Sequence, residues 1–481
     1  MPGKTRWSAW VAVLIICSGA PELPAATRIK ARLLNPVSSY RSKVGDPVEA
    51  LVVPPACPEP SHAFPPATVV AGRVQSLHRV GLGIEHETAR LRLDFSSLRF
   101  SDGQSFPIAS RLAEIDNARE RVDRHGAVHG IRATASLSSR LGSRIALEAF
   151  EHPFLLGPAL VLESELFRFP DPEIEYDRGT EISLDVTLPP ALAAPTCPTQ
   201  APDAAAGTPN ELGRIVASLP AWSYSKRQPQ PMDLINLVFV GTRRSLEAAF
   251  TAAGWTGARP NSMAAGLHAV RAIAEEREYN LAPMRTLLLN GDEPDLRLQT
   301  TLNTFEKRDH LRIWEQRDEF DGRPVWASAA TRDLATTFSM GHPFGFTHEI
   351  QSNLDLERDK VVSDLQLTGC VDSVEFVRRG PAAGVDARKG VYTDSRLAVI
   401  ILNSCETPTA DFSESVPEPP PAFAVRFVRR LTLTTRNHFL RDNIVWRSAD
   451  AARLGVDAVR HWYSRRNEQR LAAASLRASL Q

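Results

Sequence analysis

Two histidines and a nearby carboxylate occur in an order that could support metal-binding or acid–base chemistry. His310 and Arg312 are two residues apart in the apolar segment HLRIW, so on a strand they share one face with Trp314. Asp333 follows the next apolar segment, and His348 follows the loop MGHPFGF. We take His310, Arg312, Asp333 and His348 as the catalytic candidates.

Two further carboxylates extend this set. Asp355 and Asp359 have the i,i+4 spacing that puts like charges on one helix face, which is unfavourable unless a cation or the helix N-terminus compensates. Imidazole and carboxylate groups are the ligands of zinc, manganese and iron sites. The candidate metal ligands are His310, Asp333, His348, Asp355 and Asp359, with a divalent transition metal as the implied cofactor.

The same residues also fit a structural polar network, which is the interpretation we favour. Carboxylates in a first helical turn are stabilised by the helix dipole, and Arg312, Arg332 or Arg358 can neutralise them. No compact HExxH spacing and no phosphate-cradling glycine loop occur. The sequence therefore leaves open whether the chain is an enzyme, and it identifies no other cofactor.

The elements that must position these residues form a predicted α+β domain over residues 232–402. Apolar and alternating segments predict strands at 235–240, 286–289, 296–302, 310–315, 325–330, 374–377 and 397–402. Helical spacing predicts helices at 244–253, from 262 to about 279, and at 354–367.

Residues 27–188 are predicted to form a separate β-rich domain. Short alternating segments at 29–33, 48–53, 69–74 and 91–95 are separated by turns, a pattern typical of a small closed or partly closed barrel. The segment EISLDVTLP closes the domain as a strand, whereas 135–165 contains a possible helix. The segments TRIKARLLNPVSSYRSKVGDPVEALVV and FPPATVVAGRVQ weakly resemble the β-barrel domain of the type IV secretion channel scaffold. That resemblance implies the barrel shape only.

Proline-rich segments separate the modules. Residues 189–231 read as a Pro/Ala-rich linker that ends in a short helix at 211–219, and 403–422 as a second linker. The tail 423–481 holds 12 arginines against 4 acidic residues, a net charge of +8, and is predicted helical from 459. Such a tail could contact a lipid surface or envelope proteins, and it could equally be a solvated helix packed on the body.

The N-terminus indicates export. Residues 1–26 combine a basic start, an apolar stretch of signal-peptide length and small residues near Ala25 and Ala26, where cleavage is expected. An uncleaved anchor is the alternative. The chain of 481 residues has as many basic as acidic residues, so its charge gives no support to nucleic-acid binding.

Four cysteines remain after the predicted leader, and they allow three disulfide connectivities. Cys57 and Cys197 stand in proline-rich loops at the edges of the first domain, whereas Cys370 and Cys405 both belong to the second. We predict the pairs Cys57–Cys197 and Cys370–Cys405. The chain has no CxxC spacing, so its cysteines do not indicate a structural zinc site.

The segments DLINLVFVGTRRSLEAAFTAAGW, KRDHLRIWEQ, GRPVWASAATRD, THEI and LDLERDKVVSDL together resemble the LssY C-terminal domain family over residues 209–380. Members occur after a signal peptide or fused to membrane-embedded regions like lipid phosphatases, and the family has no established activity. The resemblance gives the characteristic positions as His310, Arg312, Trp314, Trp326, Asp333, Thr347, His348, Glu357, Arg358 and Asp359. Members often carry an acid ahead of the HLRIW strand, where this chain has Thr300, which puts a carboxylate role there in doubt.

These patterns predict an exported cell-envelope or periplasmic protein with a non-catalytic interaction role. The alternative is a metal-dependent hydrolase of a phosphorylated or lipid-linked substrate, in which His310, His348 and a carboxylate would have to converge in a pocket. Binding of a small ligand without turnover would instead need a pocket rich in Trp314, Trp326 and Arg312.

Overall fold

A computed structural model gives the fold. It describes residues 26–57, 64–83, 87–140, 168–189, 211–226, 230–258, 283–300, 307–338, 346–379, 390–413 and 423–442, with residues 192, 268–269, 271–273, 275–276, 279, 304, 385–386, 455–456, 459–460, 462–463 and 466. The predicted signal segment, Cys197, the possible helix in 135–165, the predicted helix from 262 and the predicted tail helix lie wholly or largely outside these residues.

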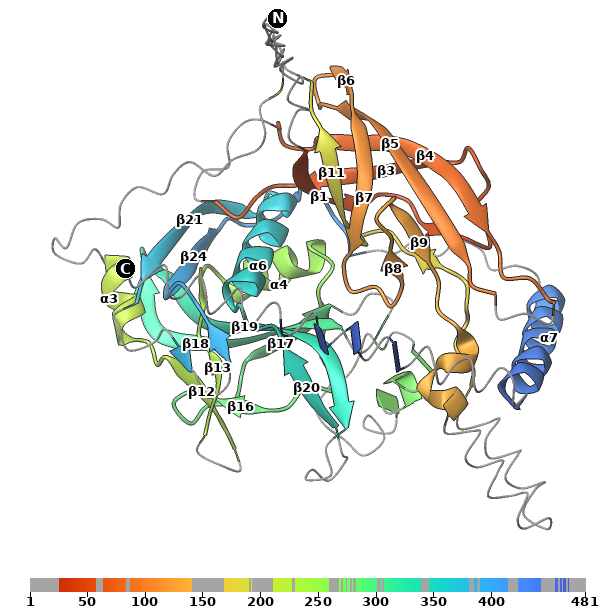
Figure 1. Cartoon of the computed structure of the whole chain (residues 1–481). Coiled ribbons are helices and arrows are strands. Elements are labelled where there is room, and N and C mark those ends of the chain that lie inside the picture. Colours follow the sequence, from red (N-terminus) through yellow and green to blue (C-terminus); the bar gives the residue numbers. More distant parts are fainter. Residues whose placement is uncertain are drawn as a thin grey trace, which may run out of the picture.

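The N-terminal domain is a nearly closed, barrel-shaped sheet, as the alternating segments predict (Figure 1). Its strand order is β7-β11-β1-β3-β4-β5-β9-β8, with β6 paired to β5. The bounds are β1 Thr27–Leu33, β3 Pro47–Val53, β4 Val69–His78, β5 Arg90–Arg99, β6 Ser105–Pro107, β7 Ala109–Ile115, β8 Arg121–Val122, β9 Ala127–His129 and β11 Glu181–Thr187, and a separate pair joins β2 Val37–Ser38 to β10 Glu175–Tyr176.

Strand alternation builds the core of this barrel. Ile29, Ala31 and Leu33 of β1 are buried together with alternate residues of its neighbours, because side chains two apart point to the same side. Where β4 meets β5 the register shifts next to Gly72, and a Cβ there would lie 2.0 Å from the Asp94 carbonyl oxygen. Only glycine allows the two strands to approach at this bend.

The second domain is an eight-stranded mixed sheet with helices α4 and α6 on one face. Its order is β15-β17-β18-β19-β14-β24-β21, with β20 paired to β19, and β14 runs parallel to β24. The bounds are β14 Leu237–Val240, α4 Arg243–Ala252, β15 Thr256–Gly257, β17 Leu296–Thr300, β18 Arg308–Phe320, β19 Arg323–Phe338, β20 Phe346–Ile350, α6 Asp355–Thr368, β21 Val371–Arg378 and β24 Arg396–Leu402.

The opposite face of this sheet is covered by shorter elements. Helix α3 (Glu211–Ser218) packs there through Leu212, Ile215 and Val216. The small sheet β13-β12-β16 completes this side. Its bounds are β12 Trp222–Ser225, β13 Pro231–Leu234 and β16 Leu287–Leu288, and a further strand pair joins β22 Val385–Asp386 to β23 Val391–Tyr392. Residues 211–226, read from the sequence as the end of a linker, thus contribute to the packing of the second domain.

Segments of the predicted C-terminal linker and tail also pack on the body. Ala410 and Phe412 are buried with Leu51 and Val53 of the barrel and Leu367 of α6. Helix α7 (Phe423–Asp442), which the sequence reading missed, lies beside the barrel at the outer edge of the molecule (Figure 1). Within the described residues, none of the helices has the length and apolar character that crossing a bilayer requires.

A disulfide joins Cys370 and Cys405, the pairing expected from the sequence, with the two Cα atoms 4.8 Å apart. It ties the start of β21 to the segment that follows β24. Cys57 is also disulfide-bonded, and its predicted partner Cys197 lies outside the described residues.

Candidate functional site

The strand pair β18–β19 places His310 beside Asp333. The two strands align Arg308 with Asp333, and His310 lies on the same face as Arg308. His310 Nε2 is 3.3 Å from Asp333 Oδ2, and Arg308 Nε donates to the same oxygen at 3.2 Å. All three side chains are buried. Two of the predicted candidates, His310 and Asp333, therefore lie side by side in a buried contact.

Arg312, the next residue on this face, has a different carboxylate partner. Its Nη1 donates to Asp233 Oδ2 at 2.6 Å, and its other nitrogens donate to the Arg285 carbonyl oxygen. Burial lowers the pKa of Arg312, and Asp233 partly offsets that effect. Trp314 is also buried, and its indole donates to the Asp292 carbonyl oxygen. Arg312 thus links β18 to strand β13 and to the segment ahead of β16.

Asp355 and Asp359 lie at the start of α6, as predicted, where a cation stands between them. Arg358 contacts the carboxylates of Asp355, Asp359 and Asp394 at 3.2, 2.8 and 2.7 Å. Asp355 also accepts hydrogen bonds from the Thr393 hydroxyl and the Asp394 amide. Burial, partly offset by Arg358, raises the pKa of Asp359. The arginine of this helix therefore supplies the cation that the carboxylate pair requires.

The two predicted groups lie on different sides of the sheet. Leu311 packs against Val361 of α6, so its neighbour His310 points to the opposite face. His348 is a residue of β20 and lies opposite Thr336 of β19. Its side chain is outside the described part of the structure. Among the described residues there is no cluster of three or more His, Cys, Asp or Glu side chains able to hold a metal ion. A metal site that uses His348 stays a prediction.

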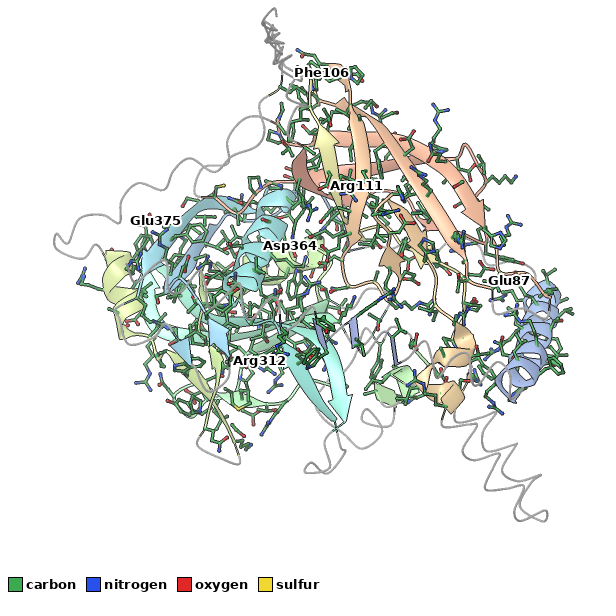
Figure 2. All side chains as sticks on the ribbon, viewed as in Figure 1. Glu87, Phe106, Arg111, Arg312, Asp364 and Glu375 are labelled. Carbon is green, nitrogen blue, oxygen red and sulfur yellow. A yellow bond between two sulfur atoms is a disulfide. The ribbon has the colours of Figure 1, made fainter. Side chains whose placement is uncertain are left out.

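A second set of buried charges lies where α6 meets the barrel (Figure 2). Arg32 of β1 contacts Asp364 of α6 at 2.5 Å, and Lys360 of α6 contacts Glu181 of β11 at 3.2 Å. The same Lys360 is 3.3 Å from both oxygens of Asp364, and Asp364 Oδ2 also accepts from the Trp255 indole at 3.0 Å. These four charged side chains are all buried and join the two domains.

This set continues toward the sheet. Asp309 accepts hydrogen bonds from the Thr300 hydroxyl and from the amide of Asn117 in the barrel. Arg332 of β19 is 3.7 Å from Asp309 and binds Asp116 of the barrel. We call the whole set the interdomain charge cluster. Its members are Arg32, Asp116, Glu181, Asp309, Arg332, Glu357, Lys360 and Asp364.

Electrostatics divides the carboxylates of this cluster into two kinds. Burial, then repulsion from Asp309, raises the pKa of Glu357 well above its ordinary value. Burial also raises the pKa of Asp309. For Glu181 burial acts the same way, but Lys360, Lys30 and Arg32 together hold its pKa below the ordinary value. The cluster therefore keeps Glu181 ionised and favours a proton on Glu357.

A neutral Glu357 balances the cluster. Its three cations, Arg32, Arg332 and Lys360, together with Lys30, which lies outside the cluster and contacts Glu181 at 2.9 Å, then face four carboxylates, Asp116, Glu181, Asp309 and Asp364. A carboxyl that holds a proton beside an ionised partner is also the arrangement of an acid–base pair. Here, however, Glu357 is only 1% exposed and Asp309 is fully buried. The described cavities lie elsewhere, one lined by Asn35, Arg41 and Asp46 and one by Arg379.

Sequence reasoning missed most of this cluster. Asp309 falls on the strand face opposite His310, between apolar residues that pack on α6. The available signal was in α6, where Glu357, Lys360 and Asp364 recur at i, i+3 and i+7 and so share one helix face. A charged stripe on a helix is ordinarily exposed to solvent, and the sequence of α6 does not show that the barrel covers this one.

The comparisons with known proteins address the second domain. The family model described as LssY C-terminus matches residues 218–394, so the chain carries an LssY C-terminal domain, as expected. The match does not reach the barrel, and the type IV secretion resemblance of residues 27–188 is not confirmed. No curated protein matches this chain.

Proposed function

We propose that this is an exported cell-envelope protein that works by binding rather than by catalysis, and that helix α7 docks it on an anionic lipid surface. The disulfides at Cys370–Cys405 and at Cys57 support export, because such bonds persist in oxidising compartments. The leader-like residues 1–26 support the same location.

Burial of the candidate residues supports a non-catalytic role for the LssY domain. His310, Arg312 and Asp333 are at most 6% exposed; Arg312 contacts Asp233, and Asp333 contacts both Arg308 and His310. Trp326 is buried as well, and its indole donates to the Gly241 carbonyl oxygen at 2.9 Å. These contacts join neighbouring strands and loops, as expected of a structural polar network.

The observation that carries the proposal is the outer face of α7. The inner face of the helix packs on the barrel side through Leu433 and Leu440, while Arg429 binds Glu173. On the outer face, helical spacing brings together exposed apolar side chains at 57–60% exposure: Val428, Leu431 and Phe439, with Phe427 beside them. Apolar residues on both faces of one helix indicate two separate contacts.

The charge beside this outer face favours lipid. Arg426 and Arg430 are exposed at the flank of the apolar residues. An amphipathic helix with this composition lies in a membrane interface, and each arginine near an anionic surface contributes about 1 kcal/mol. The net charge of +8 over residues 423–481 adds a longer-range attraction.

Vesicle flotation tests the proposal. The protein is purified after export, with its N-terminus determined, and mixed with vesicles of phosphatidylcholine alone or with added phosphatidylglycerol. We expect flotation with the anionic vesicles, weakened about tenfold or more by Phe427→Ser with Leu431→Ser, since two exposed apolar side chains are lost. Arg426→Gln with Arg430→Gln should weaken it by about 30-fold, since two contributions of about 1 kcal/mol are lost.

The matched control is Val44→Ser, which changes an apolar side chain of similar exposure (65%) on the barrel. Flotation of that variant should equal the wild type. Equal binding to both lipid compositions, no binding to either, or α7 variants that float like the wild type would contradict lipid docking and direct attention to a protein partner.

A further inference from the structure

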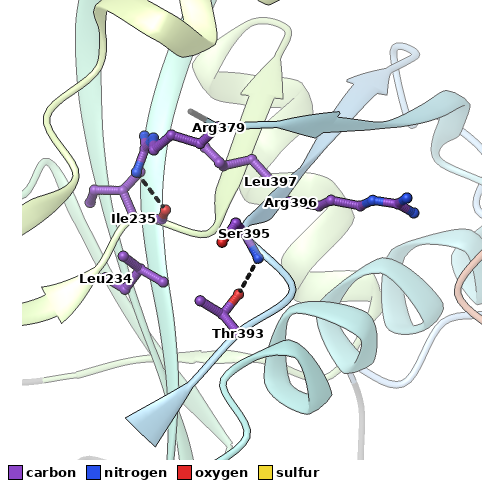
Figure 3. A pocket seen from close by; sticks show the side chains of 7 residues that line it. All are labelled: Leu234, Ile235, Arg379, Thr393, Ser395, Arg396 and Leu397. Atoms are coloured by element: carbon purple, nitrogen blue, oxygen red, sulfur yellow. Dashed lines mark hydrogen bonds between the residues drawn. The ribbon is translucent and has the colours of Figure 1, made fainter. Parts of the chain in front are cut away.

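A small cavity opens beside Arg379, which follows the end of β21 (Figure 3). Leu234 and Ile235 line one side, and Thr393, Ser395, Arg396 and Leu397, ahead of and at the start of β24, line the other. The space open to the centre of a water-sized body is about 10 Å³, room for one small occupant. The cavity lies in the LssY domain and is separate from the interdomain charge cluster.

The Arg379 guanidinium is held in place but has few partners. Its backbone amide donates to the Ser395 carbonyl oxygen at 2.8 Å, and its Nη1 donates to the Ile235 carbonyl oxygen at 3.2 Å. Nε and Nη2 are buried and make no hydrogen bond within the described structure. The residue is 8% exposed, so these donors are largely removed from water.

Three other buried arginines have carboxylates beside them. Arg32 contacts Asp364, Arg308 contacts Asp333 and Arg312 contacts Asp233. The described residues give Arg379 no such partner, and burial is the cause that lowers its pKa to about 10. It therefore keeps its charge at neutral pH. A buried charge without a counter-charge costs several kcal/mol, and a bound anion would remove that cost.

The lining suits an anion better than a cation or an apolar group. The hydroxyl residues Thr393 and Ser395 face the same space, and the side chain of Arg396 extends away from Arg379 (Figure 3). The Thr393 hydroxyl accepts from the Ser395 amide at 3.1 Å and donates to Asp355 Oδ1 at 2.6 Å, so the Arg379 guanidinium is the group that would donate to a ligand. No carboxylate lines the cavity.

We propose that this cavity is a binding site for a single small inorganic anion, of the size of chloride, held against the Arg379 guanidinium. Bound there, the anion supplies the counter-charge that those three buried arginines obtain from side chains. It also links the end of β21 to the start of β24 and to the residues ahead of β14, so its affinity adds to the stability of this sheet edge.

Thermal unfolding in chloride tests the site. Chloride replaces gluconate, which is too large for the cavity, at constant ionic strength. The wild-type Tm should rise by about 3 °C once chloride exceeds its Kd about tenfold, and it should continue to rise with the logarithm of the chloride concentration. Arg379→Gln removes the charge and should show no chloride dependence. Arg378→Gln, which changes the exposed neighbour, should keep the full rise.

Bromide anomalous scattering from wild-type crystals gives a second result that does not depend on a variant that folds. A bromide peak within contact distance of Arg379 Nε or Nη2 would support the proposal. An empty cavity or a water there, or an identical chloride response in wild type and Arg379→Gln, would overturn it.

Discussion

Glu357 is a buried acid whose surroundings oppose its charge. It is 1% exposed, and its Oε1 atom has no hydrogen-bond partner in the described structure. Burial and the neighbouring Asp309 raise its pKa, so the folded protein holds a proton that the unfolded chain releases near pH 4.5. Each pH step above that value then favours unfolding, until the raised pKa is reached.

Replacement of Glu357 by glutamine should remove this pH dependence. Below about pH 4 the glutamic acid is neutral in both states, whereas at pH 8 the wild type loses the stability that the proton supplied. We therefore expect Glu357→Gln to equal or exceed the wild type in free energy of unfolding at pH 8, within about 1 kcal/mol. Urea titrations at a series of pH values measure the slope.

Glu375→Gln is the control, because Glu375 is exposed on β21 (Figure 2). That variant should keep the wild-type pH slope. A loss of several kcal/mol in Glu357→Gln at pH 8, with the slope unchanged, would mean that Glu357 is ionised in the folded protein and binds a cation of the cluster.

The sequence predicted which side chains lie together only where they belong to the same strand or helix. The period of a strand placed His310 and Arg312 on one face, and the start of a helix placed Asp355 and Asp359. The sequence named Arg358 among three arginines that could neutralise these carboxylates, but it could not show that Arg358 also reaches Asp394. That contact depends on a loop 36 residues later in the chain, and no local pattern contains it.

Helix α6 connects the two domains. Val361, Val362 and Leu365 pack on the sheet, while Lys360 and Asp364 turn toward the barrel. The helix ends at Gly369, whose φ of 74° favours glycine, and a Cβ there would lie 2.4 Å from the Thr409 hydroxyl oxygen. The predicted bounds 354–367 nearly match the observed helix because apolar spacing determines them. The helix α6 is buried on both sides because the barrel covers the side that faces away from the sheet, and the sequence of the helix does not show this.

Asp364→Asn tests how much α6 depends on its charges. The change weakens the carboxylate contact to Arg32 and Lys360 and leaves two buried cations with less counter-charge. We expect a loss of about 3 kcal/mol in free energy of unfolding, measured by urea titration. Asp372→Asn, in an exposed side chain 3.9 Å from Arg323, should change stability by less than about 0.5 kcal/mol.

The double variant Arg32→Met with Asp364→Leu separates charge from packing. An apolar pair of similar volume often replaces a buried ion pair without loss, so this variant should be more stable than Arg32→Met alone. Additive losses in the double variant would show that the two residues act independently, and that the cluster does not couple β1 to α6.

At the scale of the whole molecule, the two domains pack against each other over apolar and charged surfaces together. Leu51 and Val53 of the barrel are buried with Leu367 and Phe412 of the second half. The charge cluster continues this contact, and α7 returns to the far side of the barrel. The sequence indicated two modules and a connection, but the contacts between them involve residues hundreds of positions apart and have no signature in either segment.

Because the two domains pack on each other, we expect that cleavage of the linker between them will not separate them. A specific protease site inserted between residues 201 and 206 would divide the chain into two parts. Cys370 and Cys405 both lie after the cut, and Cys57 and its predicted partner Cys197 both lie before it, so no disulfide would hold the parts together. After cleavage both parts should elute together in gel filtration, and they should separate only in denaturant.

High salt and the substitution Asp364→Asn test whether buried charges or exposed ion pairs hold the two parts together. The charges between the domains are buried, so raising the ionic strength to about 1 M should leave the cut protein intact, whereas exposed ion pairs would be screened. Asp364→Asn should weaken the association of the cut parts by about 100-fold. In the cut protein, the loss of about 3 kcal/mol reduces the free energy of association of the two parts. Separation in plain buffer would mean that the covalent connection, and not the buried contact, keeps the barrel against the LssY domain.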